Sequence, residues 1–233
     1  MTKRLLLVGN WKMNRPPAGF DGAESPFRPR ADIDVVVCPT VLDMPVCLKA
    51  GLIVGAQCGH PEDKGARTGD MSIAMLKEAG CHFVLCGHSD RRSHHGETDA
   101  FVRQQVIAAL EHGVHPILCV GETEEEHNGG TTREVLQRQL KDVPEGITIA
   151  YEQCWAIGSG HTPTPKEIGD IHAFIRTIVP KNTRILYGGS VNPTNALGIL
   201  RHAEVNGALI GGTSLKPKDF AEVIEIAVGI AAA

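Results

Sequence analysis

Three side chains with complementary chemistry each follow a short apolar run in this sequence of 233 residues. Glu152 ends the run "ITIAYE", His88 ends the run "FVLCGH", and Lys12 lies in "NWKMN" just after "LLLVGN". A carboxylate can serve as a general base, and an imidazole or an ammonium group can stabilise negative charge that develops on a substrate oxygen. Such a set suits proton transfer next to a carbonyl group, provided that the fold brings the three together.

The elements that would position these residues form a regular series. Continuous apolar runs, typical of parallel strands buried on both faces, occupy 5–10, 35–39, 52–57, 83–88, 116–122, 147–152, 184–190 and 208–212. Amphipathic patterns predict helices at 71–79, 97–113, 131–141, 164–178, 193–202 and 217–231. Eight such units predict an α/β protein with a closed (β/α)8 barrel, formed by residues 1–233 as a single domain. A doubly wound open sheet is the alternative.

One connection departs from this series. Between the first two strands, residues 15–34 read "RPPAGFDGAESPFRPRADID", with four prolines and two glycines. Because proline disrupts a helix interior, we expect the helix after the first strand to be missing or eroded. The apolar flank behind the first two strands then needs another cover. We expect either this segment, in extended form, or a neighbouring subunit.

Polar residues follow nearly every predicted strand, at the end where the active site of a (β/α)8 barrel lies. They are Asn10, Lys12, Gln57, His88, Glu122, Glu152, Gly188-Gly189-Ser190 and Gly211-Gly212. The two glycine segments follow the seventh and eighth strands, where such barrels bind phosphate through backbone N–H groups. Taken singly, a lysine could be solvated, a histidine could belong to the core, and a glutamate could be an ion-pair partner. Together they predict a site for a small phosphorylated ligand.

Composition argues against several other classes of protein. The net charge of −4 gives no support for a nucleic-acid partner, and no apolar run has the length of a signal sequence or a membrane span. Seven cysteines, mostly inside strand-like runs, indicate free thiols and a cytoplasmic location. His82, His88, His94 and His95 lie close in sequence, but their spacing follows no ligand motif, so we expect no metal.

The sequence resembles the triosephosphate isomerase family along nearly its whole length, apart from the stretch after the first strand. The resemblance rests on "GNWKMN" (9–14), "GAQ" (55–57), "GARTGDMS" (65–72), "CGHSDRR" (86–92), "GETD" (96–99), "YEQCWAIGSGHTPTP" (151–165), "LYGGSVNP" (186–193) and "VNGALIGGTSLKP" (205–217). It implies a TIM barrel that interconverts dihydroxyacetone phosphate and D-glyceraldehyde 3-phosphate through an enediolate, in glycolysis and gluconeogenesis. It implies no cofactor.

The resemblance also implies a role for individual residues. Glu152 would be the base, His88 the electrophile at the substrate oxygens, and Lys12 the cation that holds the substrate. The remaining implied roles are these: Asn10 orients nearby groups, the N–H groups of Gly158, Ser190, Gly211 and Gly212 bind phosphate, Asp90 supports Lys12, and residues 153–163 form a lid anchored by Trp155. A closing lid fits the chemistry, since an enediolate left in water would expel phosphate.

The resemblance further implies a homo-oligomer, at least a dimer, in which the loop around Thr68 inserts beside the site of the partner. Two departures from the family pattern stand out. Gln153-Cys154 replace the usual proline and aliphatic residue after the base. Asp90 replaces the usual glutamate, and we expect this shorter side chain to loosen Lys12 and reduce turnover. An isomerase of a related sugar phosphate and a catalytically silent barrel that acts as a binding protein stay open as alternatives.

Overall fold

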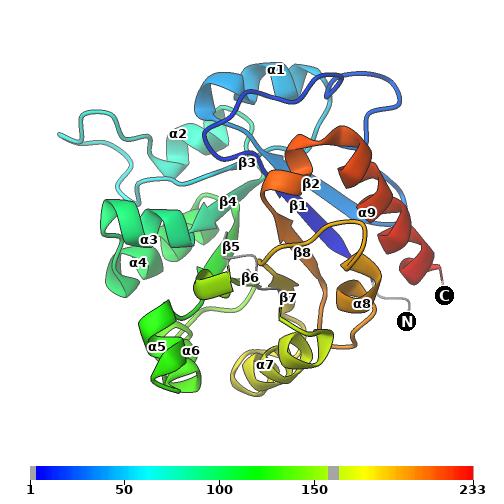
Figure 1. The fold of residues 1–233 in the computed structure, drawn as a ribbon. Coiled ribbons are helices and arrows are strands. Elements are labelled where there is room, and N and C mark those ends of the chain that lie inside the picture. Colours follow the sequence, from blue (N-terminus) through cyan, green and yellow to red (C-terminus); the bar gives the residue numbers. More distant parts are fainter. Residues whose placement is uncertain (1–3, 157–162, 233) are drawn as a thin grey trace.

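In this computed structural model, which describes residues 4–156 and 163–232, parallel strands form a barrel wall with helices outside it (Figure 1). The strands are β1 (Leu6–Asn10), β2 (Asp34–Cys38), β3 (Gly55–Ala56), β4 (Phe83–Cys86), β5 (His115–Val120), β6 (Thr148–Tyr151), β7 (Arg184–Tyr187) and β8 (Gly207–Ile210). Their spatial order is β2-β1-β8-β7-β6-β5-β4-β3. A parallel bridge between Val37 and Val54 joins the two ends of this series. The predicted (β/α)8 barrel is confirmed.

Helices cover the outside of the wall. They are α1 (Met44–Lys49), α2 (Ile73–Glu78), α3 (Ser89–His95), α4 (Asp99–Glu111), α5 (Glu124–Asn128), α6 (Thr132–Gln139), α7 (Pro165–Ile178), α8 (Ala196–Leu200) and α9 (Pro217–Ala231). Short 3-10 turns are η1 (Val41–Asp43), η2 (Cys154–Ala156) and η3 (Gly212–Leu215). The six predicted helices are present: α9 has the predicted bounds, α7 begins one residue later, and the other four are shorter at both ends. Within the described ranges, no helix combines the length and apolar character needed to cross a membrane.

The amphipathic patterns of the sequence did not predict α1, α3 or α5. Neither α3 nor α5 buries a residue, so neither carries an apolar period for a sequence pattern to detect. Capping starts both helices: His88 caps α3, and Thr123 forms a capping box with Glu126 at α5. Local polar contacts, rather than an amphipathic face, therefore explain why these short helices form.

The strands are buried on both faces, as their continuous apolar runs predict. Alternate residues fill the barrel interior, namely Leu6, Val8, Val36, Cys38, Leu85, Ile117, Cys119, Ala150, Leu186 and Leu209. The other residues of each strand pack against the helices in a larger apolar cluster. This double burial makes the wall rigid and fixes the positions of the residues that follow each strand.

The connection between β1 and β2 contains no helix, as predicted from its prolines. It is not extended, however: successive turns run from Pro17 to Arg28, closed by backbone hydrogen bonds between residues three apart. Phe27 lies at its centre, fully buried, edge-on to Trp11 at 5.3 Å and stacked on Phe220 of α9 at 5.0 Å between ring centroids. The segment itself thus covers the flank of the barrel, with turns in place of the extended form that we expected.

Candidate active site

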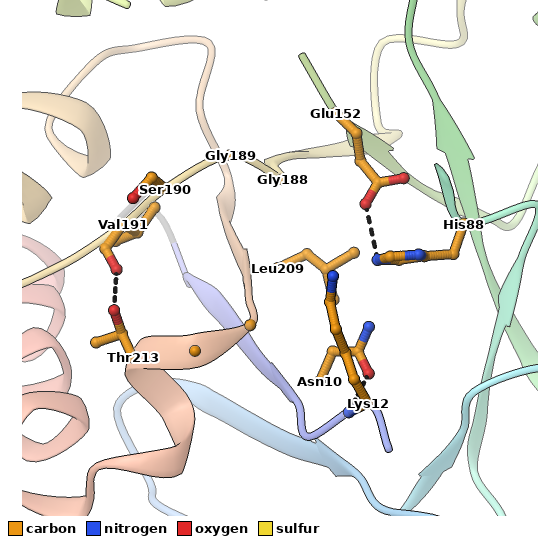
Figure 2. A pocket seen from close by; sticks show the side chains of 12 residues that line it. Asn10, Lys12, His88, Glu152, Gly188, Gly189, Ser190, Val191, Leu209 and Thr213 are labelled. Atoms are coloured by element: carbon orange, nitrogen blue, oxygen red, sulfur yellow. Dashed lines mark hydrogen bonds and ion pairs between the residues drawn. The ribbon is translucent and has the colours of Figure 1, made fainter. Parts of the chain in front are cut away.

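A cavity of about 240 Å³ opens at the carboxyl ends of the strands (Figure 2). Its lining residues are Asn10, Lys12, His88, Glu152, Gly188, Gly189, Ser190, Val191, Leu209, Gly211, Gly212 and Thr213. Seven of the residues that the family resemblance gives a role are in this set, contributed by the ends of β1, β4, β6, β7 and β8. The fold therefore brings together side chains from distant parts of the chain.

Glu152 follows β6 and points into the cavity toward His88 (Figure 2). Only 2% of Glu152 is exposed. Its Oε1 lies 3.0 Å from Nε2 of His88, and its Oε2 accepts a hydrogen bond of 2.8 Å from the backbone N–H of Ser89. Gly188 leaves room for it, because a Cβ there would lie 2.8 Å from Cγ of Glu152. Both carboxylate oxygens are thus held at the edge of the cavity.

His88 itself is the N-cap residue of helix α3. The Nδ1 atom of the ring accepts a hydrogen bond of 3.1 Å from the backbone N–H of Asp90. This bond assigns the ring proton to Nε2, which donates to Glu152. Burial lowers the pKa of His88, but the charge and hydrogen bond of Glu152, together with the charge of Asp90, raise it, and the net shift is upward. Protonation of Nδ1 would nevertheless break the helix cap, so this geometry holds the imidazole as a neutral donor.

Lys12 has a left-handed backbone, with φ of 48°, which costs a non-glycine residue about 1–3 kcal/mol. Side chains on both sides hold its backbone in this conformation. The N–H of Lys12 donates to Oδ1 of Asn10 at 3.0 Å, and its carbonyl accepts from Nε2 of Gln57 at 2.8 Å. Strain that neighbouring residues maintain in this way is typical of functional sites. With the backbone in this conformation, the side chain of Lys12 points toward the cavity (Figure 2).

The Lys12 ammonium group pairs with Asp90, whose Oδ2 lies 3.0 Å from Nζ. Burial raises the pKa of Asp90. The hydrogen bond and the charge of Lys12 lower it, and the net shift of the pKa is downward. The shorter carboxylate at this position therefore still reaches the lysine, contrary to our expectation that it would leave Lys12 loose.

The opposite end of the cavity consists mainly of backbone. Ser190 and Val191 come from the loop after β7, and Gly211 and Gly212 come from the start of η3 after β8. The sequence had indicated Ser190 and the two glycines, but not Thr213, which donates a hydrogen bond of 2.6 Å to the carbonyl of Val191 (Figure 2). Its only signal in the sequence is a hydroxyl beside a glycine pair.

Trp155 belongs to η2, three residues after Glu152. Its Nε1 donates to Oε1 of Glu122 at 2.8 Å, and its indole stacks on His127 with ring centroids 4.0 Å apart. Glu122 is fully buried, which raises its pKa, and it also accepts hydrogen bonds from Tyr151. The expected anchor of the lid is thus tied to the end of β5.

Other predicted residues lie away from the cavity or outside the described chain. Gly158 and most of the expected lid fall outside the described residues. Thr68 is exposed and does not line the cavity. Gln153 is buried and accepts a hydrogen bond of 3.4 Å from the hydroxyl of Tyr187. All seven cysteines are free thiols, as the sequence predicted.

Comparison with known proteins identifies the family. The family described as triosephosphate isomerase matches residues 5–227. The triosephosphate isomerase of Hyphomonas neptunium is 43% identical over 96% of this chain and 98% of its own length. The triosephosphate isomerases of Aquifex aeolicus and Clostridium botulinum are 41% and 40% identical, over 95% and 94% of this chain and 98% of their own lengths. These matches span the barrel and both ends of the cavity. The chain belongs to the triosephosphate isomerase family.

Proposed function

We propose that this isomerase interconverts dihydroxyacetone phosphate and D-glyceraldehyde 3-phosphate by moving a proton between adjacent carbons through an enediolate. Family membership supports the reaction and the phosphorylated triose as substrate. The observation that carries the assignment of residues is the meeting of Glu152, His88 and Lys12 at one cavity, with Oε1 of Glu152 3.0 Å from Nε2 of His88. Base and electrophile are adjacent, as proton transfer beside a carbonyl requires.

Glu152 is proposed as the base. Its carboxylate is held by the N–H of Ser89 and by Nε2 of His88. A substrate carbonyl that takes over the N–H of His88 releases Oε1, which is then free to reach the carbon that carries the transferred proton. The exchange of one hydrogen bond for another keeps the cost of this movement small.

His88 and Lys12 are proposed to stabilise the negative charge that develops on the substrate oxygens. A neutral imidazole suits this role, since the Asp90 N–H at Nδ1 keeps the donor proton on Nε2. The Lys12 ammonium group, paired with Asp90, adds a fixed positive charge on the same side of the cavity. Asn10 orients the lysine through its hydrogen bond to the Lys12 N–H.

The phosphate is proposed to bind at the backbone end, through N–H groups of Ser190, Gly211 and Gly212, with Gly158 contributing from the lid. Glycine suits this end, because a Cβ at Gly212 would meet no atom within 4 Å and the backbone is open to a ligand. Closure of residues 153–163 over the bound triose would exclude water and prevent loss of phosphate. No cofactor takes part in these steps.

We also propose that the protein acts as a homodimer, with residues 1–233 of each copy forming one domain, in the cytoplasm. Exposed apolar side chains support an interface: Met13, directly after Lys12, is 94% exposed, and Leu42 is 79% exposed. In this arrangement the exposed loop that carries Thr68 docks beside the site of the partner. Analytical ultracentrifugation tests this, and a fully active monomer at low concentration would contradict it.

A coupled assay in both directions tests the reaction and the base together. The unmodified protein should turn over both trioses, and Glu152→Gln should lower kcat by about 10²–10⁴-fold with an unchanged melting temperature. Glu124→Gln, on the exposed surface of α5, is the matched control and should keep full activity. Turnover of a four-carbon ketose phosphate without turnover of trioses would favour the related sugar isomerase. Phosphate binding without any turnover would favour the silent barrel.

A further inference from the structure

Two loops form the phosphate end of the cavity, and each is fixed by hydrogen bonds of its own. In the loop after β7, Asn195 donates from Nδ2 to the carbonyl of Ser190 at 2.9 Å. In the loop after β8, the fully buried Ser214 donates from Oγ to the carbonyl of Gly211 at 2.7 Å. These bonds hold each loop in shape, but they do not set the distance between the two loops.

Thr213 makes the connection between them. Its Oγ1 donates a hydrogen bond of 2.6 Å to the carbonyl of Val191, so η3 is tied directly to the loop after β7 (Figure 2). Both residues line the cavity. A threonine hydroxyl has one proton to donate, and this bond uses it, so the side chain has no proton left for a ligand. The hydroxyl therefore holds the two loops of the cavity wall together and does not donate to a ligand.

A phosphate group that accepts hydrogen bonds from both loops needs them at one fixed separation. Binding sites hold their groups within about 0.5 Å of the productive geometry when neighbouring hydrogen bonds lock them in place. The β-branched side chain of threonine has few accessible rotamers, so its hydroxyl makes a short and stiff link. A serine could make the same bond with more freedom, whereas a valine of similar shape could not make it.

We propose that Thr213 is a positioning residue that sets the spacing between the two phosphate-binding loops, and so determines affinity for the phosphate group. The proposal rests on the proposed function, since it takes these loops to be where the phosphate of the substrate binds. It assigns no step of the chemistry to Thr213. The consequence is a selective one: changes at Thr213 affect phosphorylated ligands and leave the proton-transfer residues undisturbed.

Two substrates separate this role from a general structural one. D-glyceraldehyde 3-phosphate carries the phosphate group, and D-glyceraldehyde lacks it but presents the same reacting carbons. For Thr213→Val we expect the KM for the phosphorylated triose and the inhibition constant for inorganic phosphate to rise about 5- to 10-fold, the effect of one lost hydrogen bond. The kcat should change by less than about 2-fold, and kcat/KM for D-glyceraldehyde should stay the same. Thr213→Ser should restore most of the affinity for phosphate.

Three results would overturn the proposal. The first is an equal loss of kcat/KM on both substrates, and the second is a lower melting temperature with an unchanged inhibition constant for phosphate. The third is a Thr213→Ser variant that behaves like Thr213→Val. If Thr213→Val does not fold, the comparison of Thr213→Ala with Thr213→Ser gives the same readout. Calorimetric titration of inorganic phosphate into each variant tests the positioning role even if the unmodified protein turns over no triose, a result that would refute the proposed function alone.

Discussion

The connection between β1 and β2 contains two stretches that are held in place by different means. Its first residues carry Lys12 in a left-handed conformation, held by two hydrogen bonds, one donated to Asn10 and one accepted from Gln57. The remainder, from Arg15 to Ile33, has no regular element and is held by the packing of Phe27 on Trp11 and Phe220. Specific hydrogen bonds position the first stretch, whereas the second is anchored mainly by the packing of a buried aromatic ring.

This difference shows what the barrel requires of each part. The second stretch can lose its helix because turns satisfy its backbone and Arg28 donates to the carbonyls of Asp21, Gly22 and Ala50. The first stretch has no such freedom, since a shift of the Lys12 backbone would move the ammonium group out of the cavity. Substitutions in the two stretches should therefore affect different properties: stability in one and activity in the other.

Phe27→Ala gives the largest expected effect. Removal of a fully buried ring between Trp11 and Phe220 should lower the free energy of unfolding by about 3–5 kcal/mol. Phe27 does not line the cavity, so kcat measured well below the melting temperature should not change. Urea denaturation and the coupled assay measure the two quantities. Phe27→Leu, which keeps most of the volume, is the control and should cost less. A large fall in kcat for folded Phe27→Ala would show that the two stretches act as one unit.

Lys12→Met should show the reverse pattern. The change keeps most of the length of the side chain and removes the charge proposed to stabilise the developing oxyanion, so kcat/KM should fall by about 10²–10³-fold. The free energy of unfolding should stay within about 0.5 kcal/mol, because Lys12 is partly exposed and its ion pair with Asp90 is open to solvent. Lys64→Met, at an exposed position, is the matched control. Equal kinetics for the two variants would remove Lys12 from the site.

Gln57→Ala tests whether the strained backbone of Lys12 needs its neighbours. Nε2 of Gln57 donates to the carbonyls of Lys12 and Cys38, at 2.8 Å and 3.0 Å. Loss of both bonds should lower kcat/KM by about 10-fold, through displacement of the ammonium group. Gln137→Ala, exposed on α6, should have no effect. A variant that loses stability but keeps kcat/KM would mean that Asn10 alone suffices to hold Lys12.

The sequence predicted the repeated strands of the barrel and the functional residues that directly follow them. Continuous apolar runs predicted the strands, and Glu152, His88 and Lys12 were found because they follow such runs. The stacking of Phe27 on Phe220 and the bond from Thr213 to Val191 join residues far apart in the chain, and no local pattern encodes them. The role of His88 as a helix cap was missed because histidine is not among the usual capping residues.

The substitution Asp90→Glu gives the smallest expected effect on activity. It tests how much the ion pair between Lys12 and Asp90 contributes to holding the first stretch. Side chains of Lys12 and Asp90 are 36% and 46% exposed, so solvent screens their attraction. Because the pair already forms at 3.0 Å, Asp90→Glu should change kcat and KM by less than about 3-fold.

The contribution of Asp90 to stability depends on pH because its pKa is lowered. Burial raises this pKa, and the contacts with Lys12 are the main cause that lowers it. A carboxyl group with a lower pKa in the folded protein stabilises the fold above its unfolded pKa, and this contribution disappears as the pH falls through the folded pKa. NMR titration should therefore find the Asp90 pKa below the ordinary aspartate range in the unmodified protein and higher in Lys12→Met. An equal pKa in both proteins would mean that Lys12 does not hold Asp90, and that the support of Lys12 comes from its backbone contacts alone.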